Sequence, residues 1–370
     1  YKVISKDLES FGEFIVIPPD SMLALPKSED EIFYRDWRLI DVDYLVLGSI
    51  QNPSIETKDI NVTYSLFDIT RQKTLYRGII AGKTDSLRIL AHNISDRIYE
   101  KIKGISGIFS TKILYVSKPS FLSDNYSLKI ADIDGFNDIS LFSSTQPILS
   151  PDWSTDGEQI AYVSFEGESS SVYVQTLRTG VRDKVSARSG INGAPVFSPD
   201  GRKLLLTLTM ESGNLDIYSL DLAGQVLTRM TRHSSIDTEA VFSPDGETIY
   251  FTSDRSGGPQ IYKVANRPGA RAERVTFEGN YNARPRISPS GEELAVVHQV
   301  QGNFRIAVVD PSTGLTQVLT NGMLDESPSF APNGAQIIYA TRQRGRGVLA
   351  SVSVDGRIHR QIVSVEGEVR

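Results

Sequence analysis

The sequence contains no cysteine among its 370 residues. Disulfides, thiolate metal sites and a cysteine nucleophile are therefore excluded together. It also has no run of eighteen apolar residues, so we expect no membrane-spanning helix. The 39 Lys and Arg residues are outnumbered by 45 Asp and Glu, which gives a formal charge of -6. We expect no nucleic-acid partner, because a phosphate-binding surface normally needs a net basic face.

Signatures of catalysis are equally scarce. The four histidines, His92, His233, His298 and His359, show neither HxxxH nor HExxH spacing. The sequence has no GxSxG nucleophile elbow, no P-loop and no GxGxxG after a strand. We therefore expect no catalytic residue, no metal ligand set and no cofactor-binding motif.

The length and composition are those of a soluble protein with two domains. Hydrophobic residues make up 39% of the chain and charged residues 23%. The sequence opens at Tyr1 without an initiator Met or an apolar leader, which is compatible with a signal peptide that has been removed.

A short motif of the form apolar-Ser-Pro-Asp-Gly recurs from the middle of the chain onward. Two copies are intact and three are degenerate, and their final glycines are 44, 45, 45 and 43 residues apart, at Gly157, Gly201, Gly246, Gly291 and Gly334. Asp-Gly is a turn signal, because Gly adopts positive φ without steric cost and Asp can bond to its own backbone. Each motif is followed by a run of β-branched and aromatic residues, such as 159–163, 203–208 and 248–251. The pattern predicts an all-β repeat of about 45 residues.

A four-stranded unit of this size cannot bury both of its faces alone, so neighbouring units must stack around an axis. A strand at 112–116, with partners at 128–132 and 139–142, adds one unit before the first motif. We therefore predict a six-bladed β-propeller over residues 109–370. The first unit lacks an innermost strand, which we expect the C-terminus to supply. The sequence ends at Arg370, where that closing strand should begin, so we expect the closing strand to be truncated.

Residues 1–108 show no trace of the repeat and predict a small α+β domain. A helix ends near Phe11, a short strand follows at 13–17, and Ser28 with Glu31 resembles a capping box that opens a helix towards Trp37. Segments 61–69 and 73–80 alternate like a hairpin. A final helix places apolar residues on one face, at Leu87, Leu90, Ala91, Ile94, Ile98 and Ile102, and ends at Gly104 and Gly107.

Several segments of the chain, in this order, resemble the TolB family, the periplasmic component of the Tol–Pal envelope system. They are Trp37 with 43–48, and then 104–109, 192–195, 252–254, 260–264 and 324–328. The Asn-Gly-Ala-Pro and Leu-Asp-Glu-Ser-Pro segments are more specific than the Ser-Pro-Asp-Gly turns, which several propeller families share.

The resemblance implies a monomeric, periplasmic, non-enzymatic scaffold that supports outer-membrane integrity and envelope constriction in cell division. It implies binding of the lipoprotein Pal across one face of the propeller. It also implies a contact with TolA through the N-terminal region, by a segment that precedes Tyr1. Colicin-like translocation peptides are further candidate ligands. One position departs from the family pattern, since Ile191 stands where members can carry His.

The loops that enter the innermost strands form the candidate binding face, because they vary from blade to blade while the Asp-Gly turns do not. Neutral drift of exposed loops is the alternative reading. The entry loops are 146–147, 191–194, 237–239, 282–284, 325–327 and 367–368, with 210–214 and 255–259 beside them. The predicted protein-binding residues are Ile191, Asn192, Ala194, Thr238, Glu239, Arg255, Arg284, Asp325 and Glu326.

Two enzyme classes share similar repeats. Prolyl-oligopeptidase-like enzymes need an additional hydrolase domain, for which this chain has no room. Calcium-dependent six-bladed hydrolases of the lactonase type hold a metal in the channel, where Glu239, Glu326 and Asn192 would have to converge. A structural divalent cation in the channel is compatible with either function.

Overall fold

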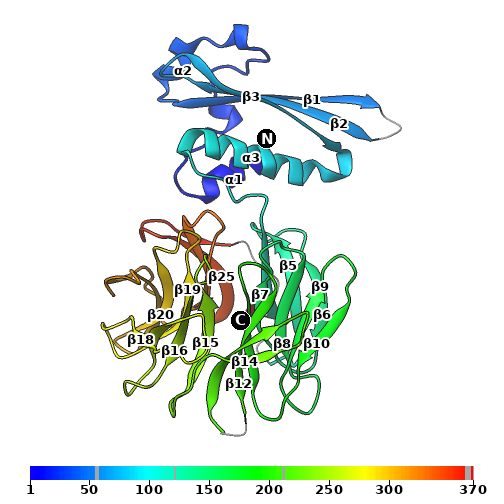
Figure 1. The fold of residues 1–370 in the computed structure, drawn as a ribbon. Helices are drawn as coiled ribbons and strands as arrows, with labels where there is room; N and C mark the ends of the chain where they lie inside the picture. Colours follow the sequence, from blue (N-terminus) through cyan, green and yellow to red (C-terminus); the bar gives the residue numbers. More distant parts are fainter. Residues whose placement is uncertain (55–57, 121, 211–212, 363–367, 370) are drawn as a thin grey trace. The chain divides into compact units, whose positions relative to one another are not determined.

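The computed structural model describes residues 1–54, 58–120, 122–210, 213–362 and 368–369. The chain divides into two compact units, Tyr1–Thr111 and Lys112–Arg370 (Figure 1). The sequence had suggested a boundary three residues earlier, after residue 108. Residues 109 and 110 are held to the first unit, because the N–H groups of Phe109 and Ser110 both donate to the Asp96 carboxylate, at 2.6 and 3.1 Å.

The first unit is a three-stranded antiparallel sheet with helices. Its sheet has the order β1-β2-β3, and its elements are α1 (Lys2–Ser10), η1 (Pro19–Ser21), η2 (Glu29–Glu31), α2 (Tyr34–Leu39), β1 (Tyr44–Ser54), β2 (Asp59–Asp68), β3 (Lys73–Lys83), η3 (Thr84–Ser86) and α3 (Leu87–Lys103). The predicted hairpin and final helix are confirmed. Gly104 ends α3 in the left-handed conformation, with φ of 78°. A side chain larger than hydrogen is disfavoured there, which is why a glycine ends this helix.

Two local predictions for this unit are wrong. Residues 13–17 form no strand. Ser28 makes no side-chain capping bond, and the 3-10 turn η2 follows it, whereas the α-helix that contains Trp37, α2, begins only at Tyr34. The Glu31 carboxylate instead accepts the backbone N–H of Lys27, at 2.8 Å. The capping-box sequence is present, but Glu31 accepts the N–H of Lys27 rather than that of Ser28.

A buried polar contact joins α1 to α3. The Asp7 carboxylate lies 2.9 Å from His92 Nδ1 and accepts the Ser95 hydroxyl at 2.7 Å. These residue types match a catalytic triad, but the geometry does not. Ser95 donates to Asp7 and to the carbonyl of Ala91 rather than to His92. The contact is therefore a structural link between two helices.

The second unit consists of sheets with four antiparallel strands each. Among the residues described, six such sheets occur, in the orders β27-β4-β5-β6, β10-β9-β8-β7, β11 to β14, β15 to β18, β19 to β22 and β23 to β26. The strands of the first three sheets are β4 (Lys112–Lys118), β5 (Tyr126–Asp132), β6 (Ile139–Ser144), β7 (Ile148–Trp153), β8 (Gln159–Ser164), β9 (Ser171–Thr176), β10 (Arg182–Ser186), β11 (Asn192–Phe197), β12 (Lys203–Thr209), β13 (Leu215–Asp221) and β14 (Leu227–Arg229). The others are β15 (Asp237–Phe242), β16 (Thr248–Ser253), β17 (Gln260–Ala265), β18 (Glu273–Arg274), β19 (Asn282–Ile287), β20 (Leu294–Val300), β21 (Asn303–Val309), β22 (Thr316–Val318), β23 (Glu326–Phe330), β24 (Gln336–Gln343), β25 (Arg346–Ser353), β26 (His359–Gln361) and β27 (Glu368–Val369).

Each sheet contacts the innermost strand of the next sheet. Contacts join β4 to β7, β7 to β11, β11 to β15, β15 to β19, β19 to β23, and finally β25 to β27. Apolar clusters fill the spaces between sheets, for example Val163 and Val174 of one sheet with Phe197 and Leu206 of the next. The second unit is therefore a β-propeller.

The Asp-Gly turns close each innermost strand in one repeated geometry. The Ser198 hydroxyl donates to Asp200 at 2.6 Å and accepts the N–H of Lys203 at 2.9 Å. Ser154 and Ser243 make the same pair of bonds. The hydroxyl bond holds the pKa of the Asp200 carboxyl below its usual value. All five motif glycines have positive φ, between 70° and 81°. The turns are structural, as their residues predict.

The C-terminus supplies a strand to the first sheet of the propeller. In β27, Glu368 pairs with Lys118 and Val369 with Ser117 of β4. The strand thus begins two residues before Arg370, rather than at Arg370 as the sequence argument placed it. Val369 is buried with Ile113, Tyr115, Ala131 and Leu349.

Shortening Val369 tests this pairing. Val369→Ala should lower the free energy of unfolding by about 1–2 kcal/mol, because roughly two buried methylene equivalents are lost. Calorimetry or urea denaturation of the full chain measures it. Val226→Ala is the matched control, since Val226 is 60% exposed. Equal losses in the two variants would show that β27 does not stabilise the propeller.

Candidate protein-binding face

Each of the innermost strands β7, β11, β15, β19 and β23 carries a β-bulge near its start. The pairing register shifts at the same place in all five strands. The first bulged residue is left-handed in every case, with φ between 45° and 56°, at Ser150, Ala194, Glu239, Arg284 and Ser327. A bulge of this kind turns its side chain out of the alternating pattern of the strand. We call these five positions the bulge residues.

The left-handed conformation costs a residue other than glycine on the order of 1 kcal/mol. Hydrogen bonds from the preceding sheet help to hold two of the five. The Arg284 N–H donates to Thr252 Oγ1 at 3.0 Å, and the Glu239 N–H donates to Thr207 Oγ1 at 3.3 Å. The strained residues are therefore fixed by contacts between adjacent sheets.

The bulge side chains form a polar chain across three consecutive sheets. Arg284 Nε donates to Glu239 Oε1 at 2.8 Å, and Arg284 Nη1 donates to Ser327 Oγ at 2.9 Å. Glu326 lies 3.6 Å from the same guanidinium. The three ionic side chains are 25–44% exposed, so a partner protein can reach them.

A fully buried polar residue precedes each of four bulges. The residues are Asn192, Asp237, Asn282 and Asp325, each at most 1% exposed. Asn192 binds Ser186 and three backbone groups of residues 188 and 190. Asp325 accepts the hydroxyls of Thr320 and Thr341, at 2.6 and 2.5 Å. We call these four residues the loop anchors, because each binds its own entry loop or an adjacent strand.

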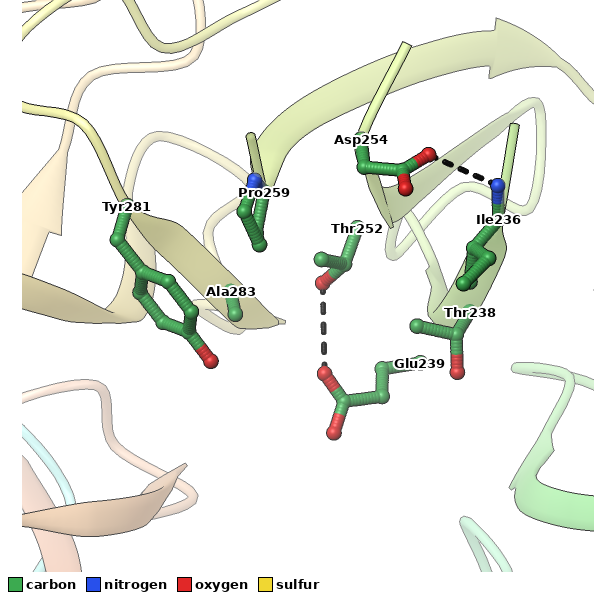
Figure 2. Close-up of a pocket in the computed structure, with 8 residues that line it drawn as sticks. All are labelled: Ile236, Thr238, Glu239, Thr252, Asp254, Pro259, Tyr281 and Ala283. Carbon is green, nitrogen blue, oxygen red and sulfur yellow. Dashed lines mark hydrogen bonds between the residues drawn. The ribbon is translucent and has the colours of Figure 1, made fainter. Parts of the chain in front are cut away.

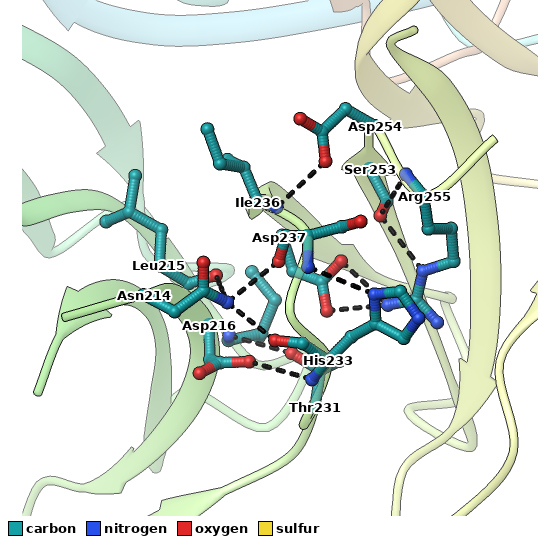
Figure 3. A network of polar contacts seen from close by, with 12 residues as sticks. Asn214, Leu215, Asp216, Thr231, His233, Ile236, Asp237, Ser253, Asp254 and Arg255 are labelled. Atoms are coloured by element: carbon teal, nitrogen blue, oxygen red, sulfur yellow. Dashed lines mark hydrogen bonds and ion pairs between the residues drawn. The ribbon is translucent and has the colours of Figure 1, made fainter. Parts of the chain in front are cut away.

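Ion pairs hold Asp237, the loop anchor of the sheet formed by β15 to β18. Arg255 Nη2 lies 2.7 Å from both carboxylate oxygens of Asp237 (Figure 3). The Arg255 guanidinium also covers the rings of Phe251 and Tyr262. In the same network Asp216 pairs with Arg229 and accepts the N–H of His233. Burial raises the pKa of the Asp216 carboxyl, whereas the charge of Arg229 acts in the opposite direction.

A pocket of about 230 Å³ opens beside the polar chain. It is lined by Ile236, Thr238, Glu239, Thr252, Asp254, Pro259, Tyr281 and Ala283 (Figure 2). In the view of Figure 2, the Asp254 and Glu239 carboxylates lie at opposite ends of the lining, with Thr252 between them. The lining therefore comes from two adjacent sheets, β15 to β18 and β19 to β22.

The structure brings four of the predicted binding residues together, namely Thr238, Glu239, Arg284 and Glu326. Ile191 is 50% exposed and Ala194 is partly exposed on the neighbouring strand. The other three do not join this group. Asn192 and Asp325 are loop anchors, and the Arg255 side chain binds the loop anchor Asp237. Of the predicted neighbouring segments, residues 211, 212 and 367 and the side chain of residue 368 lie outside the part that the structure describes. Binding by the nine predicted residues stays a prediction.

Sequence reasoning missed the bulge itself, together with Ser150 and Tyr281. Ser327 lay in a predicted entry loop but was not among the predicted binding residues. A signal for it exists, because proline follows the bulge residue in four of five repeats, at Pro151, Pro195, Pro285 and Pro328. Proline lacks an N–H and is tolerated in a strand at a bulge. The residue before each anchor position is also apolar throughout, at Pro147, Ile191, Ile236, Tyr281 and Leu324.

The convergence required for a channel hydrolase is not seen in the described part of the channel. The amide of Asn192 is fully committed to its own loop. Glu239 and Glu326 do approach one site, but the Arg284 guanidinium occupies the space between them. A cation that replaced this guanidinium would have to displace Arg284.

Asp152 lies two residues after the bulge residue Ser150, and it is the only acidic residue at this position in the five bulged strands. Its carboxylate accepts the N–H of Phe197, at 2.9 Å, across the gap between two sheets. Burial raises the pKa of Asp152 to about 6, although the charge of Arg286 and the bond from Phe197 lower it. Asp152 is therefore more readily protonated in the folded chain than in the unfolded one.

Comparisons with known proteins agree with the two-unit architecture. The TolB amino-terminal domain model matches residues 1–75, and the TolB beta propeller domain model matches residues 99–370. The Tol-Pal system protein TolB of Alcanivorax borkumensis is 52% identical over all of this chain and 84% of its own length. That of Pseudomonas syringae is 48% identical, over all of this chain and 85% of its own length. The crystal structure of TolB from Acinetobacter baumannii superposes with a TM-score of 0.93 at 40% identity, covering all of this chain and 92% of that one.

Fold and site together define a chain with an α/β amino-terminal domain and a β-propeller whose mouth carries exposed, ordered polar side chains. The chain belongs to the TolB family, and so to the Tol-Pal system. No helix in the described residues is long and apolar enough to cross a membrane.

The Asp237–Arg255 pair predicts a large stability effect. Arg255→Ala should destabilise the chain by about 3–5 kcal/mol, because it leaves a buried carboxylate without its partner. The double variant Asp237→Asn with Arg255→Ala should recover part of this loss, since the buried charge is removed as well. Denaturant unfolding measures both variants. Additive losses would mean that the two residues do not interact.

Asp152 predicts a pH-dependent stability effect. Its folded pKa is raised, so its contribution to stability is complete below about pH 4 and is lost as the pH rises through about 6. Asp152→Asn should therefore raise the melting temperature at pH 7.5 and change it little at pH 4.5. A stability difference between variant and wild type that is the same at both pH values would contradict the raised pKa.

Proposed function

We propose that this chain is a non-enzymatic scaffold of the periplasm that binds the lipoprotein Pal through the mouth of its propeller. We further infer that the six four-stranded sheets are the blades of one ring. This inference is supported by the series of contacts that runs from β4 to β27. Membership of the TolB family suggests Pal as the partner, and the bulge residues supply the surface that would bind it.

The observation that carries the proposal is the set of bulge residues. Five strained positions occur at equivalent places near the starts of five innermost strands, and they carry four residue types, at Ser150, Ala194, Glu239, Arg284 and Ser327. Backbone strain of this kind is retained where the surrounding structure fixes it, and it concentrates at functional sites. An asymmetric protein partner needs such a set, because it meets every blade with a different part of its surface.

The environment of the mouth also suits a protein. Ile191 and Ile236 are 50% and 45% exposed, and Ile236 lines the pocket beside the polar chain together with Glu239. Exposed apolar side chains beside satisfied polar groups are typical of protein interfaces. The bulge geometry is held by contacts between sheets, so little conformational entropy is lost on binding.

The rest of the proposed role follows from the family. The chain acts as a monomer without a catalytic cofactor, and it contacts TolA through its N-terminal region. By binding Pal it supports outer-membrane integrity and constriction of the envelope during cell division. Colicin-like translocation peptides would compete for the same face. A structural divalent cation in the channel stays a prediction.

The double variant Thr238→Ala with Glu239→Lys tests the face. It should weaken binding of Pal by at least about tenfold, because one polar contact is lost and one charge is reversed. Isothermal titration calorimetry measures the affinity, and the melting temperature should stay close to that of the wild type.

The matched control is Thr155→Ala with Glu158→Lys. This pair makes the same two changes at an exposed Asp-Gly turn, at the other end of an innermost strand. Unchanged affinity of the first variant would remove Thr238 and Glu239 from the site. Equal weakening by both pairs would point to net charge instead of a specific face.

A further inference from the structure

The pocket beside the polar chain combines an apolar wall with hydrogen-bond acceptors. Ile236, Pro259, Tyr281 and Ala283 supply the wall (Figure 2). Tyr281 is held in place by an edge contact with Phe304, with ring centroids 5.1 Å apart. The wall is therefore ordered, and it can pack against an aliphatic chain.

The polar groups of the pocket mostly accept hydrogen bonds. Asp254 Oδ1 accepts the N–H of Ile236 at 2.9 Å, and no described side chain donates to its Oδ2. Glu239 accepts Arg284 on Oε1 and has only a long contact, 3.4 Å, from Thr252 on Oε2. Two carboxylates thus keep acceptor capacity towards the pocket.

This balance favours one kind of occupant. A group that only donates, and that carries a positive charge, complements two carboxylates with spare acceptors. An ammonium fits better than a second guanidinium, because Arg284 already takes one oxygen of Glu239 and leaves no two-oxygen edge there. The apolar wall then suits the methylene stem of lysine, which packs along apolar surface while its charged end binds polar groups.

We propose that this pocket receives a lysine side chain of the partner protein. Its ammonium binds the Asp254 carboxylate, the Glu239 carboxylate at the other end of the lining adds to the negative potential, and its methylenes pack against Ile236, Pro259 and Tyr281. This inference rests on the proposed function, since it names the chemistry by which the partner is recognised at that face. Asp254 is a new binding residue in this proposal, because neither the repeat pattern nor the entry loops had singled it out.

The first arm of the test uses a small probe and no partner protein. Butylammonium chloride is titrated into the full chain, and methyl NMR shifts are followed at Ile236, Thr238 and Thr252. We expect saturable shifts confined to the pocket, with affinity lowered about fivefold by Asp254→Asn. Butanol, which has the same stem without the charge, should not saturate. Equal binding of butanol, or equal binding by the variant, would overturn the proposal.

Asp254→Asn is a suitable variant because the amide oxygen can still accept the N–H of Ile236. Only the charge is removed, and the melting temperature confirms that the fold is kept. Asp183→Asn is the matched control, since it makes the same change on an exposed outer strand. It should leave the affinity of the probe unchanged.

The second arm uses Pal itself. Asp254→Asn should weaken Pal binding about fivefold and reduce its dependence on salt, while Asp183→Asn should do neither. If Pal binds the wild type and Asp254→Asn equally well, the lysine pocket is wrong and the proposed function stands. If Pal does not bind the wild type, the proposed function fails, and the butylammonium arm alone decides whether the pocket binds an ammonium.

Discussion

The arrangement of the binding face depends on a left-handed residue near the start of five innermost strands. A regular strand would alternate its side chains between the two faces of each sheet, and both faces are covered by neighbouring sheets. The bulge interrupts this alternation, so one side chain per strand leaves the packed interior. Arg284 and Glu239 reach each other only because both residues are displaced in the same way. They are 45 residues apart, which is one repeat, so equivalent positions of adjacent sheets come into contact.

The loop anchors occupy the same position in four sheets, but the hydrogen-bonding groups of their side chains are satisfied in two different ways. Asn192 and Asn282 have an amide that both donates and accepts, so each binds carbonyl groups of its own entry loop. Asp237 and Asp325 only accept, and buried carboxylates of this kind need hydrogen-bond donors around them. Arg255 supplies them for Asp237, and two threonine hydroxyls supply them for Asp325. The anchors thus differ because their partners differ, while the path of the backbone is the same.

Local signals explain how much of this architecture could be predicted from the sequence. The Asp-Gly turns, the strands after them and the last helix of the first unit are specified within a few residues, and they were predicted. The capping box failed because the Glu31 carboxylate accepts the N–H of Lys27 instead of that of Ser28. The strand predicted at 13–17 is also absent, since that short apolar run has no strand to pair with in the sheet β1-β2-β3. Burial of Asn192 and Asp325 was also out of reach. It depends on donors such as Ser186 and Thr341, whose approach follows from how the sheets fold over the loops.

Drift of exposed loops would also make the entry loops differ between blades, so variation alone does not separate it from binding. The identities of the bulge residues favour the proposed binding over drift. Glycine and asparagine adopt positive φ at the lowest cost, and drift under a stability constraint would favour them at these five positions. Neither occurs there, and the residues present are Ser, Ala, Glu, Arg and Ser. Two of them carry long ionic side chains whose backbone N–H groups are held by threonines of the preceding sheet. The strain retained at these five positions therefore supports the proposal that they belong to a protein-binding face.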